Sequence, residues 1–292
     1  MTERIFVTIP SYCDPDLANT VKSLFRKADN PSRVRASIFE QEDVNTRVYM
    51  KECYDWNIDI ERIHYTDAQG AGYARAQAQK AYDGEEYHYQ IDSHSRFKQG
   101  WDTKMIEMHK SIDKDKVVLS QHPLPMIPDG DGYKVVLKHP KLWNYPSYPS
   151  AVWSRTHRCW TARRNKMPLH KPHEAYTVLA GNLFTTGNFI EEVPYDPDIA
   201  WMGEELCLAA RAYTRGWSIY APNECYIYHF YKRPAEKKLW TKDRIGIKKF
   251  SWHSLEMRTH ESVEKVLAGQ TTGEFGVKKG DRWEAFQETY RK

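Results

Sequence analysis

Short apolar segments alternate with amphipathic ones over the first 120 residues of the chain. The segments Ile5 to Ile9 and Val34 to Phe39 are rich in β-branched residues and predict strands. Between them, apolar residues recur at helical spacing from Leu17 to Phe25. The same reasoning predicts strands at 58–65, 87–91 and 116–119, and helices at 46–54, 73–82 and 101–112. This alternation predicts an α/β fold with a doubly wound sheet.

The periodic pattern disappears between residues 122 and 175 and then returns. This span carries eight prolines among tryptophans and tyrosines, with arginines interleaved. We expect a long functional loop, because aromatic faces beside cations suit a sugar, a peptide or a stacked base. Simple packing of a Pro-rich loop is the alternative. Beyond it, strands are predicted at 178–186, 217–221 and 225–231, with a helix from Trp201 to the Arg215-Gly216 stop.

The length of 292 residues is the upper end of what one domain usually holds. We expect a catalytic domain over residues 1–235, in which 122–175 is a variable insertion on the acceptor side. Residues 236–292 are expected to form a C-terminal helical appendage. Its two helical stretches, Ser254 to Leu267 and Asp281 to Tyr290, are separated by a glycine-containing link.

Composition narrows the class of protein. The five cysteines are widely spaced and include no Cys-x-x-Cys, so neither a disulfide framework nor a zinc ribbon is indicated. The chain has no signal-peptide pattern and no apolar run long enough for membrane insertion, so a cytoplasmic protein is expected. The net charge is +4, but residues 131–170 carry eight Lys/Arg against one acid, and 231–292 carry fifteen against nine. Such segments face an anionic partner or form a solvated basic surface.

Two glycines precede the helix predicted from about residue 73. The stretch reads Gly70-Ala71-Gly72, and Arg75 follows on the first helical turn. Glycines let backbone amides approach phosphate oxygens, and an arginine there reaches the same anion. The absence of Gly-x-Gly-x-x-Gly and of Gly-Lys-Ser/Thr argues against a dinucleotide-binding loop or an ATPase-type phosphate loop. The competing interpretation is that these glycines only form the turn before the helix and bind no ligand.

The strongest chemical candidate is the Asp-x-His pair at the end of the strand that begins at Tyr87. Asp92 and His94 lie two residues apart, so they point the same way if the strand continues. An oxygen donor beside an imidazole suits a divalent ion such as Mn²⁺, although many Asp-x-His pairs are loop residues that only form hydrogen bonds. His229 lies in an aromatic run, where a histidine is usually a core residue; beside Asp92 and His94 it becomes a third ligand.

Seven short motifs in order resemble the GT-A glycosyltransferases, and more narrowly the cytosolic hydroxyproline polypeptide N-acetylglucosaminyltransferases with their bacterial and viral relatives. The motifs span residues 5–233 and are Ile9-Pro10-Ser11-Tyr12 with Asp14-Pro15, Phe39-Glu40-Gln41, Gly72-Tyr73-Ala74-Arg75, Gln90 to Phe97, Val193 to Pro197, Gly203-Glu204-Glu205 and Tyr228-His229. The resemblance implies a GT-A fold, which is Rossmann-like with a doubly wound mixed sheet.

The resemblance also implies a metal-dependent retaining transferase that moves a hexosyl or N-acetylhexosaminyl group from a nucleotide sugar, such as UDP-GlcNAc. Mn²⁺ or Mg²⁺ is then held by Asp92, His94 and His229. The remaining implied roles fall to two groups of residues. The nucleotide-binding group is Thr8, Pro10, Ser11, Tyr12, Gln41, Gly72 and Arg75. The catalytic group is Arg75, which neutralises the departing diphosphate, with Glu204 and Glu205, which orient the sugar or the acceptor hydroxyl.

The acceptor and the chemistry each have alternatives. A macromolecular acceptor is expected, either a protein hydroxyl or, for a viral-type enzyme in a host cytoplasm, a hydroxymethylated base in DNA, where phosphates add affinity. A base in duplex DNA would need flipping. The competing functions are a non-catalytic nucleotide-sugar or glycan-binding module and a nucleotidyltransferase on the same fold.

Overall fold

A computed structural model describes residues 3–43, 55–129, 132–136, 147–154, 159–164, 170–233, 238–239 and 249–291. For 147–154, 159–164 and 289–291 it describes the backbone alone. The helix predicted at 46–54 lies outside these residues, as do Trp143, Tyr145, Arg155, Arg158 and Lys166 of the aromatic and basic span.

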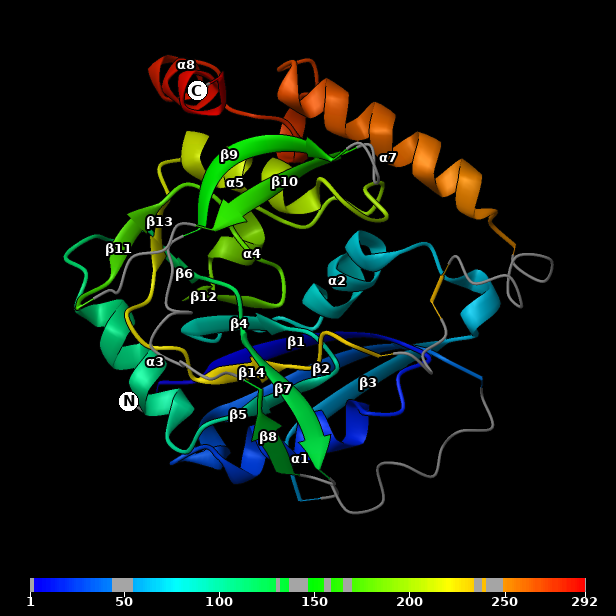
Figure 1. The fold of residues 1–292 in the computed structure, drawn as a ribbon, viewed down its shortest axis with the longest axis vertical. Coiled ribbons are helices and arrows are strands. Elements are labelled where there is room, and N and C mark those ends of the chain that lie inside the picture. The colour runs from blue at the N-terminus through cyan, green and yellow to red at the C-terminus, as the bar shows by residue number, and fades with distance from the viewer. Residues whose placement is uncertain are drawn as a thin grey trace.

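The fold is built on an eight-stranded mixed sheet with the order β11-β13-β6-β12-β4-β1-β2-β3 (Figure 1). Its strands are β1 (Ile5–Tyr12), β2 (Val34–Gln41), β3 (Ile58–Ile63), β4 (Tyr87–Ile91), β6 (Val117–Ser120), β11 (His173–Ala175), β12 (Asn182–Thr186) and β13 (Ser218–Ala221). The strands β3, β2, β1 and β4 are parallel, whereas β12 runs antiparallel to both β4 and β6. The predicted mixed α/β sheet is confirmed.

Helices cover both faces of the sheet (Figure 1). On one face, α1 (Leu17–Arg26) and α3 (Trp101–Lys110) share a hydrophobic cluster with alternate residues of β1, β2 and β4. On the other face lie α2 (Ala71–Gln79), α4 (Phe189–Glu192) and α5 (Glu204–Thr214). Among the described residues, short 3₁₀ helices occur at Pro31–Arg33, Tyr65–Asp67 and Gly273–Phe275. Because both faces are covered, the central strands β1 and β4 are almost entirely buried on both sides.

The expectation of a long loop over 122–175 is wrong for the described residues. They form strands β7 (Leu124–Asp129), β8 (Gly132–Val135), β9 (Ser147–Ser154) and β10 (Cys159–Arg164) ahead of β11. The pair β9–β10 forms a two-stranded sheet, and β7 and β8 join β5 (Ser95–Phe97) and β14 (Ile227–His229) in a four-stranded one. Pro125 and Pro128 lie inside β7, and prolines argue against a strand because they cannot donate to the ladder.

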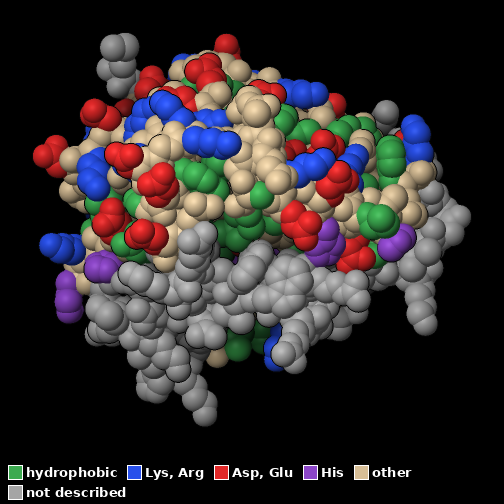
Figure 2. All heavy atoms as spheres, turned by 90° about the horizontal axis from the view of Figure 1, so that it is seen from above, with side chains coloured by type: hydrophobic (Ala, Val, Ile, Leu, Met, Phe, Trp, Pro, Cys, Tyr) green, Lys and Arg blue, Asp and Glu red, His purple; other side chains and the backbone are tan. Residues whose placement is uncertain are grey.

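The two C-terminal helices pack against α5, on one face of the sheet. They are α7 (Trp252–Leu267) and α8 (Asp281–Arg291), close to both predicted stretches, and both contact α5. Val266 and Trp283 belong to the same hydrophobic cluster as α5. Figure 2 views the molecule from this side and shows Lys/Arg interspersed with Asp/Glu, not a patch of one sign. Within the described ranges, no helix has the length and apolar character needed to cross a membrane.

Candidate active site

A cavity of about 580 Å³ opens where the carboxyl ends of β1, β2 and β4 meet. This is the edge at which open α/β sheets bind ligands, and the volume is typical of a small-molecule site. Strand ends supply Pro10, Ser11, Tyr12 and Gln41, and the start of α2 supplies Arg75. The other predicted residues that line the cavity are Asp92, His94, Glu204, Glu205 and His229.

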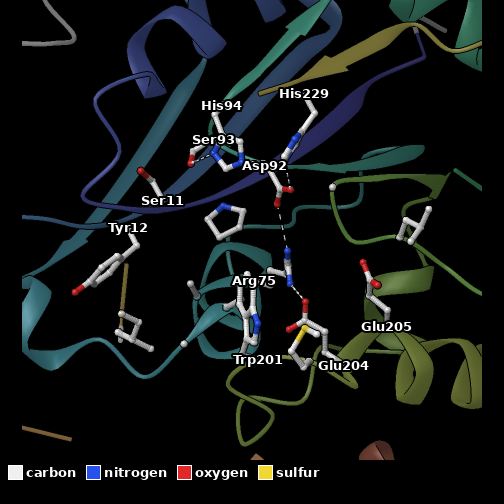
Figure 3. A pocket seen from close by; sticks show the side chains of 18 of the residues that line it. Ser11, Tyr12, Arg75, Asp92, Ser93, His94, Trp201, Glu204, Glu205 and His229 are labelled. Carbon is white, nitrogen blue, oxygen red and sulfur yellow. Dashed lines mark hydrogen bonds and ion pairs between the residues drawn. The ribbon is translucent and has the colours of Figure 1, made fainter. Parts of the chain in front are cut away.

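Asp92, His94 and His229 converge at one side of the cavity (Figure 3). One potential ligand atom from each lies within 4.8 Å of the others. His229 Nε2 is 2.9 Å from His94 Nε2 and 3.1 Å from Asp92 Oδ2. Neighbouring ligands of an octahedral ion with bonds of about 2.1 Å are about 3 Å apart. The donor set and its spacing therefore fit a divalent cation.

The charge states of Asp92 and His229 suit metal binding. Burial, and secondly the neighbouring His94, lowers the pKa of His229 to about 4, so its ring is neutral at physiological pH. Burial alone raises the pKa of Asp92, but the hydrogen bond from His229 and the charge of Arg75 outweigh burial and leave that pKa well below its usual value. A neutral imidazole and an ionised carboxylate are the forms that bind metals.

The loop that carries Asp92 and His94 is held by the first turn of α1. Thr20 Oγ1 donates to the carbonyl of Ser93 at 2.7 Å and accepts the backbone N–H of Ser95 at 2.9 Å. His94 Nδ1 lies 2.7 Å from Asp14 Oδ2, in the turn before α1. These contacts join segments about 75 residues apart in sequence, and they fix where the loop presents its side chains.

Arg75 bridges two carboxylates across the cavity (Figure 3). One guanidinium nitrogen donates to Glu204 Oε1, and the other lies 3.3 Å from Asp92 Oδ1. Burial alone lowers the pKa of Arg75, but the charges of Glu204 and Asp92 outweigh it, so the guanidinium stays protonated. Glu204 Oε2 is buried and has no hydrogen-bond partner among the described residues. A buried oxygen of this kind is costly unless a ligand satisfies it.

Glu205 lines the cavity but does not join the Arg75 bridge. Its Oε1 accepts the backbone N–H of Ala180 at 2.8 Å. Burial, and secondly the charge of Glu204, raises the pKa of Glu205 to about 7. The two adjacent glutamates therefore have different environments: Glu204 forms an ion pair with Arg75, and Glu205 accepts a backbone N–H.

Gly181 allows the backbone to approach Asp92 closely. A Cβ at this position would lie 2.5 Å from Asp92 Oδ2, which is closer than real Cβ contacts occur. The absence of a side chain here is therefore a condition for the observed position of the carboxylate.

Gln41 and Ser11 lie where β1 and β2 end. Gln41 Nε2 donates to the carbonyl of Ser11 at 3.2 Å, but Gln41 Oε1 and Ser11 Oγ make no hydrogen bond within the part of the chain that the structure describes. Both residues line the cavity and are at most 3% exposed. Polar atoms this deeply buried are normally satisfied, so these two indicate a ligand contact.

Two predicted site residues do not reach the cavity lining. Thr8 is fully buried, and its Oγ1 lies 2.9 Å from His88 Nε2 inside the sheet. Gly72 packs against the loop that follows β12 and α4, where a Cβ would lie 2.2 Å from the carbonyl oxygen of Ile199. This close helix–loop packing accounts for Gly72 without a phosphate.

The cavity also contains residues that the sequence reasoning assigned no role. Asp14 appeared only in the Asp14-Pro15 part of a family motif, whereas its side chain contacts His94. Arg233 contacts Asp14 across 219 positions of sequence, and Trp201 lines the wall near Glu204 (Figure 3). The Asp14 motif was a usable signal, but no local pattern indicated the contact of Arg233.

Comparisons with solved structures find the same fold in several glycosyltransferases. GalNAc-T7 with UDP, GalNAc and Mn²⁺ matches at 14% identity and a TM-score of 0.59, over 99% of this chain and 55% of that one. S. aureus TarS 1-349 in complex with UDP-GlcNAc matches at 14% identity and a TM-score of 0.51, over 97% of this chain and 79% of that one. The mannosyltransferase PcManGT from Pyrobaculum calidifontis, in complex with GDP-Man and Mn²⁺, matches at 10% identity and a TM-score of 0.55. This match covers 98% of the present chain and 68% of PcManGT.

These relatives are longer than the present chain, which spans 60% of another TarS 1-349 structure and 36% of the TarS structure. Curated protein sequences contain no match. A family model described as Glycosyltransferase (GlcNAc) matches residues 4–55 and 42–282, which together cover nearly the whole chain. With its GT-A architecture, the chain belongs to this GlcNAc glycosyltransferase family.

Proposed function

We propose that this protein is a metal-dependent retaining glycosyltransferase that transfers a sugar from a UDP-sugar, such as UDP-GlcNAc, to a hydroxyl of a macromolecular acceptor. The observation that carries the proposal is the convergence of Asp92, His94 and His229 within 4.8 Å at the edge of a cavity formed by strand ends. The GlcNAc glycosyltransferase family and the nucleotide-sugar ligands of TarS and GalNAc-T7 support it.

The proposed metal ligands are Asp92 Oδ2, His94 Nε2 and His229 Nε2, which would hold Mn²⁺ or Mg²⁺. Such an ion neutralises the negative charge that develops on a departing nucleoside diphosphate. Three protein ligands leave coordination positions open for phosphate oxygens.

Arg75 and Glu204 organise the sugar side of the proposed site. The guanidinium is bound by Glu204 and Asp92, so in this role it orients two carboxylates and balances their charge. Glu204 Oε2 has no hydrogen-bond partner among the described residues and is the proposed acceptor for a hydroxyl of the donor sugar or of the acceptor. Glu205, bonded to Ala180, supports the wall beside it.

The proposed nucleoside contact is made by Gln41 Oε1 and Ser11 Oγ. Because Gln41 Nε2 is engaged by the carbonyl of Ser11, its oxygen is the atom left to accept a hydrogen bond. Uracil offers an imide N–H flanked by two carbonyl oxygens, so an acceptor beside a hydroxyl matches one edge of this base. Tyr12 and Pro10 complete the same wall.

The deciding experiment is turnover or hydrolysis across a panel of UDP- and GDP-sugars, with Mn²⁺ and with EDTA. We expect activity with a UDP-sugar that EDTA abolishes and Asp92→Asn reduces by at least a hundredfold. Tight donor binding without hydrolysis would instead identify a binding module. Pyrophosphate release from a nucleoside triphosphate would identify a nucleotidyltransferase. No binding or turnover of any donor, with Asp92→Asn behaving as wild type, refutes the proposal.

For the acceptor, the two proposed classes are a protein hydroxyl and a hydroxymethylated base in DNA. Affinity for duplex DNA that falls steeply with salt concentration favours the second class. Arg163 and Arg164 belong to the basic span at 131–170. We expect their charge reversal to weaken acceptor use more than donor hydrolysis, whereas equal loss of both activities places these arginines at the donor.

A further inference from the structure

His94 has a second contact, on the side of its ring that faces away from His229. Its Nδ1 lies 2.7 Å from Asp14 Oδ2, whereas its Nε2 faces His229. The Asp14 side chain is only 2% exposed, so this carboxylate has little contact with water. Asp14 is not one of the three residues whose ligand atoms converge.

Asp14 is itself held in one orientation by several donors. Ser93 Oγ donates to Oδ2 at 2.6 Å, and the backbone N–H of Asp16 donates to Oδ1 at 2.9 Å. The preceding residue, Cys13, has φ of 44°. Among the non-glycine residues that the structure describes, only Cys13 and Met202 have positive φ, and both adjoin cavity residues. Strained backbone of this kind persists where the surroundings enforce it.

Arg233 balances the charge of the buried carboxylate. Its Nη1 lies 3.2 Å from Asp14 Oδ2 and 2.7 Å from His94 Nδ1. A guanidinium only donates, so Arg233 and Asp14 make opposite demands on His94 Nδ1: the carboxylate requires a proton there, and a hydrogen bond from Arg233 requires a lone pair. The tautomer of His94 therefore decides which contact is made.

We propose that Asp14 is a positioning residue that keeps the proton of His94 on Nδ1 and thereby presents the Nε2 lone pair to the metal. In metal sites, a carboxylate on the outer nitrogen of a histidine ligand fixes the ring orientation and raises its basicity. Arg233 then donates to Asp14 and neutralises it. This inference rests on the metal site of the proposed function.

The same loop offers a matched control. Asp16 lies two residues from Asp14 and also binds a buried partner, because both of its oxygens accept from Arg96, at 2.6 and 2.9 Å. The Arg96 side chain is fully buried. Asp16→Asn therefore disturbs the loop and a buried ion pair without touching His94, so it separates a general loss of stability from an effect on the ring.

The experiment titrates Mn²⁺ into the protein and follows free Mn²⁺ by electron paramagnetic resonance. It compares wild type with Asp14→Ala, Asp14→Asn, Asp16→Asn and His94→Ala at 25 °C, after circular dichroism has verified folding. We expect Asp14→Ala to bind about 10–100-fold more weakly. Asp14→Asn retains an acceptor oxygen without the charge, so it should fall between wild type and Asp14→Ala. Asp16→Asn should lose stability but keep the wild-type affinity.

The outcomes separate this inference from the proposed function. Wild-type affinity in Asp14→Ala, with loss in His94→Ala, overturns the role of Asp14 and leaves the metal site intact. Equal weakening by Asp16→Asn and Asp14→Ala overturns it as well, because the effect is then one of loop stability. If wild type binds no Mn²⁺ or the His94→Ala affinity is unchanged, the metal site fails and this inference fails with it.

A second measurement needs no Asp14 variant. Long-range ¹H–¹⁵N spectra of the metal-free wild type distinguish the two imidazole tautomers, and His94→Ala identifies the signals of this ring. We expect the Nδ1–H form of His94, because the partner of one ring nitrogen sets the tautomer. Observation of the Nε2–H form overturns the proposal in favour of donation from Arg233.

Discussion

Gly181→Ala is predicted to damage the metal site while leaving the fold intact. The added Cβ would lie 2.5 Å from Asp92 Oδ2, and ordinary van der Waals contact begins at 3.4 Å. The carboxylate oxygen must therefore move by about 0.9 Å. Metal–ligand distances tolerate only about 0.2 Å, so Asp92 loses its proposed coordinating position.

The cost to stability should be small for two reasons. The atom in the way is the end of the Asp92 side chain, which can rotate, and the φ of Gly181 lies outside the left-handed region that favours glycine. Replacing glycine by alanine at a compatible position stabilises a protein by roughly 0.4–1 kcal/mol, through the unfolded chain. We expect the free energy of unfolding to change by less than about 1 kcal/mol, and the affinity for Mn²⁺ to fall by about 10–100-fold.

Urea denaturation measures the first quantity and Mn²⁺ titration the second, both without turnover. Gly132→Ala is the matched control, because its Cβ meets nothing closer than Asp129 O at 3.3 Å and it lies in the β7–β8 hairpin. Wild-type affinity in Gly181→Ala refutes the reasoning, since Asp92 is then either free to shift without consequence or not a ligand. A large loss of stability refutes it too, because the backbone would then be the constrained element.

Three further variants test other parts of the site. Gly72→Ala places a Cβ 2.2 Å from the backbone oxygen of Ile199, which cannot rotate away. Urea denaturation should therefore show that the free energy of unfolding falls by about 1–3 kcal/mol, and an unchanged denaturation midpoint contradicts this. Arg75→Met leaves the buried Glu204 without its ion-pair partner and leaves Asp92 with His229, so it should cost about 3–5 kcal/mol. Adding Glu204→Gln should restore part of this loss, and strict additivity of the two changes refutes the bridge. The pKa of Glu205 is raised from 4.5 to about 7, so between these pH values the folded protein keeps a proton that the unfolded chain releases. The free energy of unfolding of the wild type should therefore fall by roughly 3 kcal/mol between about pH 4.5 and 7.5, relative to that of Glu205→Gln. Parallel pH profiles of the two proteins contradict this.

The strands and helices of the central sheet could be predicted closely because their patterns are local. Apolar runs at Ile5 and Val34 and the helical spacing after Leu17 match β1, β2 and α1 within a few residues. The described residues between 122 and 175 were predicted wrongly because prolines inside β7 and β9 obscure the strand pattern, and because β7 and β11 pair with distant strands. Tyr228 and His229 of β14 pair with β7, about a hundred positions away in the sequence, and the local hydrophobic pattern does not predict such a contact.

The sequence by itself determined the chemical types available to the site: a carboxylate and an imidazole at the end of a strand, an arginine at a helix start and paired acids at another. Only the tertiary structure decided which of them meet. In the folded protein His229 contacts Asp92, and Arg75 binds Glu204. Thr8 and Gly72, which were predicted to contact the ligand, instead pack inside the protein. The reason is physical: side-chain type is a local property, but burial and hydrogen-bond partners arise only when segments far apart in the chain fold against one another.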